Sequence, residues 1–245
     1  MHRALITGAS RRIGAVLAQH LHRNYDLELH ARTPREEADT LYQALHTLRP
    51  DSVRWHYAEL ANAEARAKLA ENLGKAPLEL AVFNASHFEP SDLRTSASQQ
   101  VAILQQALQV NLISTWDLCL RLRPRLAAAV RRSGDASVVV ILDLYASYPL
   151  PGYEAYSISR AAGAMLVRSL AQAFGKEGIR VNAVAPGTVL WSEGPVRAES
   201  ETQITESSAL GRTGLPADVA QAVAYLAGAR HTTGISLPVD GGRRL

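Results

Sequence analysis

The sequence predicts an α/β fold: one domain spanning residues 1–245, in which a parallel sheet of about seven strands carries helices on both faces. Short apolar runs alternate along the chain with longer segments of helical periodicity, an order typical of parallel sheets with crossover helices. Hydrophobic residues make up 47% and charged residues 20% of the 245 residues, which is enough to bury a sizeable core. The chain shows no segment of linker composition and no internal repeat, so a single domain is expected.

The first part of the chain predicts three strands separated by helices. Residues 4–7 (ALIT) form a short apolar run that predicts a buried strand, and apolar residues at helical spacing predict a helix over 12–22. The run LELH at 27–30 predicts a second strand, and a helical pattern follows it through Leu48. Residues 53–60 (VRWHYAEL) predict the third strand.

The middle of the chain continues the alternation. An Ala-rich helix is expected up to Leu73, followed by a fourth strand at 78–86 (LELAVFNAS). Residues 97–132 predict a long helical segment, with a break near Pro124 because proline removes a backbone donor. The β-branched run SVVVILD at 137–143 predicts the fifth strand.

The last part supplies two further strands and the segment expected to cover the site. A helix is predicted over 155–174, a strand over 179–186, a helix over 216–229 and a final strand over 234–242. Residues 188–215 lack clear periodicity and are rich in Ser, Glu, Thr and Gly. Because ligands of such folds bind outside the carboxyl ends of the strands, this segment is expected to act as a substrate loop.

Composition excludes several functional classes. The formal charge is +3 and the pI about 9.2, but the basic residues are mostly Arg and form no run longer than two, so no nucleic-acid partner is expected. The apolar runs fall short of the roughly 18 residues that cross a bilayer, so no membrane partner is expected. One cysteine, Cys119, and eight His without metal-ligand spacing predict neither a disulfide framework nor a metal site. These features favour a cytoplasmic protein.

The first strand leads directly into TGASRRIG (7–14) and then a helix. Gly8 permits a tight turn, Gly14 permits close packing of the helix, and the helix N-terminus offers free N–H groups to a pyrophosphate. The spacing is longer than in the usual G-x-G-x-x-G fingerprint, and Arg12 stands where a glycine is common.

The residues after the second strand indicate which dinucleotide is bound. NAD enzymes commonly place an acid there for the ribose 2′-hydroxyl, whereas NADP enzymes place Arg near the 2′-phosphate. This chain has Arg32 there, and we expect Arg11, which lies in the loop, to assist. We therefore expect NADP(H) as the cofactor.

The whole chain resembles the short-chain dehydrogenase/reductase family, which implies a Rossmann-like doubly wound domain. The matching elements occur in the family's order: TGASRRIG (7–14), AEL (58–60), FNAS (83–86), Asn111 in QVNLIS, YSISR (156–160), VNAVAPG (181–187) and VDGG (239–242). The resemblance implies a set of cofactor-binding residues: Gly8, Ser10, Arg11, Arg12, Ile13, Gly14, Arg32, Thr33, Glu59, Leu60, Asn84, Ala85, Ser86, Tyr156, Arg160, Pro186, Gly187 and Val189.

The catalytic positions depart from the usual family tetrad of Asn, Ser, Tyr and Lys. Asn111 and Tyr156 match, but Asp143 stands where Ser is expected and Arg160 where Lys is expected. The resemblance implies Asn111, Asp143, Tyr156 and Arg160 as the catalytic residues.

The Asp143 position is similar to that of pteridine reductases, a branch of the family in which an Asp works with the Tyr. Three more features resemble that branch: Arg12 in the R-[IL]-G ending of the loop, the run N-A-S-x-F at 84–88, and P-L-x-G-Y at 149–153. The resemblance implies that Phe88 stacks a pterin ring against the nicotinamide. The implied substrate-binding residues are Arg12, Ser86, Phe88, Asp143, Tyr153 and Tyr156.

These residue types suit the reduction of a C=N bond. The cofactor brings a hydride, and Tyr156 coupled to Asp143 would supply the proton. A phenol with an unperturbed pKa near ~10 needs a nearby cation to lower it, and Arg160 keeps that charge.

The leading prediction is an NADPH-dependent reductase of dihydropterins, with biopterin or dihydrofolate as further substrates. Two alternatives remain: a carbonyl or 3-oxoacyl thioester reductase of the same family, and an NADP-binding protein with little catalytic activity, favoured by Arg160. The resemblance also implies a homotetramer, with 97–132 and 155–174 as the interface helices.

Overall fold

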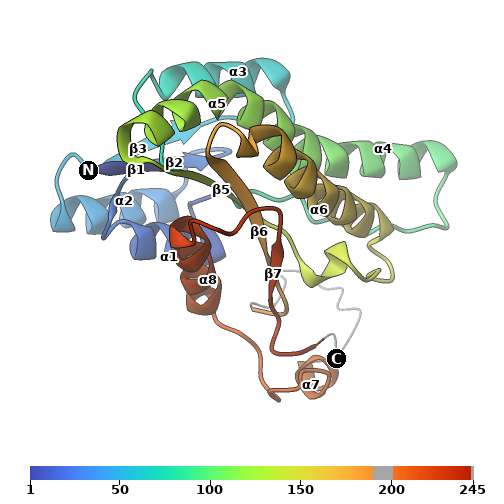
Figure 1. Cartoon of the computed structure of the whole chain (residues 1–245). Helices are drawn as coiled ribbons and strands as arrows, with labels where there is room; N and C mark the ends of the chain where they lie inside the picture. Colours follow the sequence, from blue (N-terminus) through green and yellow to red (C-terminus); the bar gives the residue numbers. More distant parts are fainter. Residues whose placement is uncertain (190–200, 244–245) are drawn as a thin grey trace.

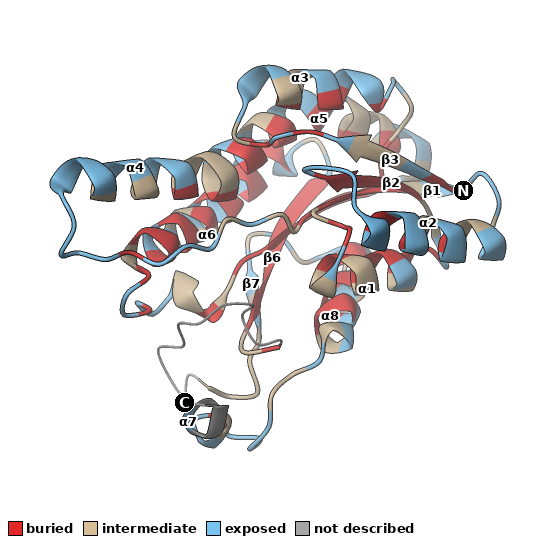
Figure 2. Cartoon of the chain, turned by 180° about the vertical axis from the view of Figure 1, so that it is seen from behind, coloured by how far each residue is buried: buried red, intermediate tan, exposed pale blue. Residues whose placement is uncertain are grey.

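The computed structural model describes residues 1–189 and 201–243, and these form one seven-stranded parallel sheet between two layers of helices (Figures 1 and 2). The strands run in the spatial order β3-β2-β1-β4-β5-β6-β7, which is the doubly wound arrangement that the sequence predicted. Their bounds are β1 His2–Thr7, β2 Tyr25–Ala31, β3 Val53–Tyr57, β4 Leu80–Phe83, β5 Ala136–Ile141, β6 Ile179–Pro186 and β7 Ser236–Val239.

Two apolar cores hold the helices to the sheet. Buried residues of α1, α2 and α8 join one face of the strands, and those of α3, α5 and α6 join the other. The bounds of the helices are α1 Arg12–Leu21, α2 Glu36–Leu48, α3 Ala63–Asn72, α4 Ala97–Leu108, α5 Ser114–Ser133, α6 Glu154–Gly175, α7 Glu201–Glu206 and α8 Pro216–Gly228. A short 3₁₀ turn, η2 (Leu144–Ala146), follows β5.

The break that the sequence predicted near Pro124 is wrong. Helix α5 passes through Pro124 without interruption, because its buried face, which includes Leu118, Leu122 and Leu126, stays packed against the sheet. The irregularity lies earlier, in a π-helical turn at Gln109–Ile113 (η1) that joins α4 to α5. π-Turns inside helices frequently mark functional sites.

Four predicted strands are shorter in the structure, among them the strand predicted over 137–143, which ends at Ile141 and leaves Asp143 in the loop after it. The strand predicted over 53–60 ends at Tyr57, the one over 78–86 covers Leu80–Phe83, and the one over 234–242 covers Ser236–Val239. Because all seven strands are parallel, the loops after them meet at one edge of the sheet, where ligands of such folds bind. The predicted substrate loop, 188–215, includes the short helix α7, and its residues 190–200 lie outside the described residues.

Candidate active site

The loop between β1 and α1 has the shape of a phosphate cradle. Gly8 has φ +65°, and a Cβ atom there would lie 2.8 Å from Ala85 Cα. A Cβ atom on Gly14 would lie 2.0 Å from Gly8 O, so neither position accepts a side chain. Arg11, the N-cap residue of α1, makes no side-chain capping bond. The N–H groups of the first turn are therefore available to a ligand at the helix N-terminus. These residues fit a dinucleotide pyrophosphate.

Arg12 adopts the left-handed conformation, with φ +53°. That conformation costs a non-glycine residue of order 1–3 kcal/mol, which explains why a glycine is common at this position. This backbone conformation sets the direction in which the Arg12 side chain leaves the loop between β1 and α1.

Asn84 and Thr7 join the cradle to the next strand. The Asn84 side-chain amide donates to Thr7 O at 3.1 Å and to Gly8 O at 2.9 Å. Thr7 Oγ1 in turn accepts the backbone N–H groups of Asn84 and Ala85 at 3.0 and 3.1 Å. Asn84, predicted to contact the cofactor, thus also fixes the loop that carries Gly8.

His30 is a loop-anchoring residue that the sequence analysis did not single out. Its Nε2 lies 3.0 Å from Ala58 O, and the backbone N–H of Gly8 donates to its Nδ1 at 3.4 Å. Burial lowers the pKa of His30 to about 4, against the opposing influence of its bond to Ala58. The imidazole is therefore neutral at pH 7, with Nε2 protonated and Nδ1 accepting.

The residues predicted to recognise the adenosine half lie just beyond β2 and β3. Arg32 and Thr33 are exposed immediately after β2. Glu59 is exposed after β3, where its Oε1 accepts the N–H of Ala61 at 3.0 Å, and Leu60 is buried. Arg32 is thus a cation at the carboxyl end of β2, the strand next to the one that leads into the phosphate cradle.

Asp143 and Tyr156 form a direct pair, although they come from a strand end and a helix. The Tyr156 hydroxyl donates to Asp143 Oδ2 at 2.8 Å. The other carboxylate oxygen, Oδ1, accepts the N–H of Tyr145 at 3.1 Å and so caps η2. Asp143 thus serves both as a local cap and as the partner of Tyr156.

Burial disfavours charge on both members of this pair. The pKa of Asp143 is raised by burial, which outweighs the lowering by the Tyr145 N–H, by the Arg160 charge and by the Tyr156 hydroxyl. The pKa of Tyr156 is raised, first by burial and then by the Asp143 charge, against the lowering effect of Arg160. Tyr156 is therefore a neutral phenol at pH 7. The net lowering of its pKa that the sequence predicted from Arg160 is wrong, because burial outweighs the charge of the guanidinium.

Arg160 lies one helical turn after Tyr156 and stacks on it. The guanidinium carbon is 4.9 Å from the centre of the Tyr156 ring, a cation–π contact. Nη1 donates to Ile141 O at 3.2 Å, and Nη2 donates to Ser86 Oγ. The buried Nε has no hydrogen-bond partner among the described residues, which leaves one unused donor on this side chain.

Asn111 holds the loop after β4 through hydrogen bonds to His87, rather than to Asp143 or to the Tyr156 hydroxyl. It sits in the π-turn η1, where its Oδ1 accepts the N–H of His87 at 2.7 Å and its Nδ2 donates to His87 O at 2.9 Å. Nδ2 also lies 2.9 Å from Ser159 Oγ. The π-turn thereby fixes the segment that carries Ser86 and Phe88.

An aromatic wall stands beside the pair. The rings of Phe88 and Tyr153 stack with centroids 4.4 Å apart and planes at 11°, and Phe88 meets the edge of Tyr156 at 4.7 Å and 89°. Tyr153 is buried, whereas Phe88 is 44% exposed. One face of Phe88 is thus covered by Tyr153, and the ring remains open to a flat ligand.

The end of β6 closes the site on its other side. Pro186 ends β6, and Gly187 packs so tightly that a Cβ atom on it would lie 2.7 Å from Asp240 Cα. Val189 is buried just before the segment that the structure does not describe. The predicted catalytic and substrate residues Asp143, Tyr156, Arg160, Ser86, Phe88 and Tyr153 therefore meet at one place, between the ends of β4 and β5 and the start of α6.

Two further searches concern other kinds of site. Within residues 1–189 and 201–243, no group of three His, Cys, Asp or Glu side chains is placed to hold a metal ion. In the same part of the chain, no helix is long and apolar enough to cross a membrane.

Comparison with known proteins agrees with this geometry. A family model described as "Enoyl-(Acyl carrier protein) reductase", of the short-chain dehydrogenase/reductase type, matches residues 8–244. The chain belongs to the short-chain dehydrogenase/reductase family. Family membership makes it an oxidoreductase that uses a nicotinamide cofactor.

The relatives bear different names. The chain is 33% identical to "Granaticin polyketide synthase putative ketoacyl reductase 2" of Streptomyces violaceoruber, covering 99% of this chain and 96% of the relative. It is 30% identical to "Pteridine reductase 1" of Leishmania tarentolae, with 99% and 96% covered. It also superposes on the "Pseudomonas aeruginosa RhlG/NADP active-site complex" with a TM-score of 0.85 and 28% identity, covering 100% of this chain and 96% of that one.

Proposed function

We propose that this short-chain dehydrogenase/reductase is an NADPH-dependent reductase of dihydropterins, with oxidised pterins and dihydrofolate as further substrates. The observation that carries the proposal is the 2.8 Å bond between the Tyr156 hydroxyl and the Asp143 carboxylate, beside the exposed ring of Phe88. A carboxylic acid next to the proton donor suits a substrate whose reacting atom is a basic ring nitrogen. The 30% identity to a pteridine reductase over nearly the whole chain supports the same assignment.

Tyr156 and Asp143 form a proton relay in this proposal. Bound NADPH would supply the hydride to the ring carbon. Tyr156, kept neutral by burial, donates its hydroxyl proton to the adjacent ring nitrogen. Asp143, whose pKa is raised, takes up a proton from solvent and passes it to Tyr156 across their hydrogen bond.

Arg160 supports this relay without exchanging protons. A guanidinium stays charged at any pH of interest, so it cannot act as the relay that a lysine provides. Its charge stabilises the negative charge that develops on Tyr156 as the proton leaves. The unpartnered Nε would hold the nicotinamide ribose.

The aromatic wall selects for a flat substrate. A pterin ring would stack on the open face of Phe88, with Ser86 and Arg12 binding its polar edge and the cofactor phosphates. Ser86 is already fixed in place by its bond to Arg160. NADPH rather than NADH follows from the exposed cation Arg32 at the end of β2, which would pair with the 2′-phosphate.

A second candidate is the reduction of a carbonyl group, including that of a 3-oxoacyl thioester. The 33% identity to a ketoacyl reductase of a polyketide synthase favours it. Asp143 disfavours carbonyl reduction, because a neutral hydroxyl polarises a carbonyl better than a carboxylate does. A third candidate, an NADP-binding protein with little turnover, rests on Arg160 in place of lysine.

Steady-state oxidation of NADPH separates these candidates. The wild type is assayed with dihydrobiopterin, with an acetoacetyl thioester and without substrate. Turnover of dihydrobiopterin with a higher kcat/KM than the thioester is expected, and the reverse order assigns the chain to the carbonyl reductases.

The same assay on Arg160 variants tests the third candidate. Arg160→Lys should be comparably or more active than the wild type, and Arg160→Ala should lose most activity and some NADPH affinity. An inactive wild type whose Arg160→Lys variant gains turnover would instead mark a binding protein.

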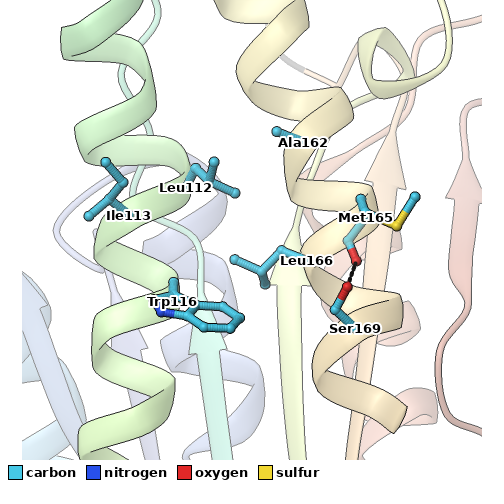
Figure 3. A pocket seen from close by; sticks show the side chains of 7 residues that line it. All are labelled: Leu112, Ile113, Trp116, Ala162, Met165, Leu166 and Ser169. Carbon is cyan, nitrogen blue, oxygen red and sulfur yellow. Dashed lines mark hydrogen bonds between the residues drawn. The ribbon is translucent and has the colours of Figure 1, made fainter. Parts of the chain in front are cut away.

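The surface of α5 and α6 supports the proposed homotetramer. A hollow of about 280 Å³ lies between these helices, with Leu112 and Trp116 on one wall and Met165 and Leu166 on the other (Figure 3). Trp116 is 45% and Met165 56% exposed, a large apolar area for a free surface. We propose that a second copy of the chain covers it, with Trp116 of each copy in the hollow of the other. Trp116→Glu should then lower the mass measured by light scattering, and an unchanged mass would refute this face.

The cofactor and the buried thiol of Cys119 fit a reducing compartment, for which we propose the cytoplasm.

A further inference from the structure

Three neighbouring strands end beside the Asp143–Tyr156 pair, and each contributes one side chain that the proposed function has not used. Strands β5, β6 and β7 are adjacent and parallel, so the residues after them meet at the same edge. Tyr145 follows β5, Thr188 follows β6 and Arg243 follows β7. Arg243 is the one permanent cation of these three.

A tight turn directs Arg243 back toward the site. The backbone N–H of Arg243 donates to Asp240 O at 3.1 Å, and Asp240 Oδ1 accepts the N–H of Gly242 at 3.1 Å. Gly241 and Gly242 both have positive φ, of 63° and 77°, which the reversal requires.

The turn is also anchored to the elements around it. Gly187 N–H donates to Val239 O at 2.9 Å, and Gly241 O accepts from the Ser208 hydroxyl at 2.9 Å. The direction in which Arg243 leaves the backbone is therefore set by β6 and by the segment after α7.

The guanidinium lies near the pair, at the ends of β5 and β6. Its Nη1 donates to Thr188 Oγ1 at 2.7 Å, and its central carbon lies 5.9 Å from the centre of the Tyr145 ring. Its positive charge contributes to lowering the pKa of Asp143, although burial of that carboxyl has the larger, opposite effect. Arg12 and Arg32, in contrast, follow β1 and β2, on the far side of β4.

We propose that Arg243 recognises a carboxylate on the substituent of the substrate ring. This assignment rests on the proposed function and narrows its substrate class to pterins that carry an acidic side chain, such as dihydrofolate. A guanidinium offers a planar fork that matches a carboxylate, and the aromatic face of Tyr145 restricts the directions that this fork can take. With the cofactor phosphates at the loop after β1 and its ring at the Asp143–Tyr156 pair, a substrate would have its substituent on the side of β6 and β7.

The test compares two substrates with the same ring. Dihydrofolate carries glutamate carboxylates on its substituent, whereas dihydrobiopterin carries a neutral dihydroxypropyl group. Steady-state kcat/KM values with NADPH are measured for both in the full-length wild type, Arg243→Ala and Arg243→Lys. Arg230→Ala, which removes an exposed arginine that follows α8, is the matched control for loss of one positive charge.

Arg243→Ala should lower the ratio of the dihydrofolate to the dihydrobiopterin kcat/KM by about tenfold or more, because a charge-assisted contact is lost. The loss should appear mainly in KM, and Arg243→Lys should restore part of it. Arg230→Ala should keep the wild-type ratio. Thermal unfolding of each variant shows that the fold is intact.

An equal change for both substrates, or no change in the ratio, overturns the assignment of Arg243 while leaving the proposed function in place. A wild-type protein that reduces neither pterin overturns the proposed function, and the assignment with it, before any variant is compared.

Discussion

Truncation of Phe88 to Ala removes one wall of the proposed pterin site, and the contacts of its ring set the size of the effect. The ring is 44% exposed, and its covered face lies 4.4 Å from Tyr153. A stacked aromatic pair contributes about 0.5–1.5 kcal/mol beyond burial of area. At about 1.4 kcal/mol per factor of ten, the loss of one stack should raise the pterin dissociation constant roughly 2- to 12-fold.

The cofactor site should be little affected by this change. The ring of Phe88 packs on those of Tyr153 and Tyr156, whereas the phosphate cradle is formed by the loop between β1 and α1. Fluorescence titration should therefore show nearly unchanged NADPH affinity, while titration with biopterin in the presence of NADP⁺ shows the weaker binding. Tyr225→Ala removes another exposed aromatic ring, on α8, and should leave both affinities at the wild-type value. Unchanged pterin affinity in Phe88→Ala, or an equal loss for pterin and cofactor, would show that the ring does not bind the substrate.

Three further changes test other parts of the site. Arg32→Asp should narrow or reverse the preference for NADPH over NADH, because a like-charge clash replaces a charge-assisted contact, and equal affinity of the wild type for both cofactors refutes the role of Arg32. His30→Gln should flatten the acid dependence of stability. The unfolded chain binds a proton near pH 6.5 and the folded chain only near pH 4, so the wild type loses about 3 kcal/mol of unfolding free energy across that window, of which about 2 kcal/mol is lost between pH 7.5 and 5. Denaturation at pH 7.5 and 5 measures this difference. Asp143→Asn should stabilise the fold at pH 7, because the raised pKa means that the ionised carboxyl opposes folding. The advantage should shrink as the pH falls through the raised pKa and vanish near the pKa of about 4 that the carboxyl has in the unfolded chain, and lower stability of the variant at pH 7 contradicts this account.

Burial patterns allowed most of the fold to be predicted from the sequence. Strands such as β5, whose residues are all buried, have few polar side chains because both faces of a parallel sheet are covered. The π-turn at Gln109–Ile113 leaves no such pattern, since it adds a residue to a helix without changing its composition, and Pro124 is a misleading signal in a helix held by its packed face.

The candidate site was predicted in part, for a different reason. Asp143, Tyr156 and Arg160 were predicted because they lie close together in the sequence, within motifs of the family. Asp143 follows β5, and Tyr156 and Arg160 lie on α6. His30 and Arg243 were not found, because their contacts with Gly8 and Thr188 join residues 22 and 55 positions apart. Such contacts depend on the order of strands in the sheet, which local sequence patterns do not specify.

The proposal depends most on the claim that the Asp143–Tyr156 pair determines the choice of substrate. The most direct measurement is the ratio of kcat/KM for dihydrobiopterin to that for an acetoacetyl thioester, in the wild type and in Asp143→Ser, which restores the hydroxyl usual in the family. We predict a ratio above one for the wild type and a marked fall in Asp143→Ser, through loss of pterin reduction and gain of carbonyl reduction. A wild type that prefers the thioester, or a ratio that Asp143→Ser leaves unchanged, would contradict the claim.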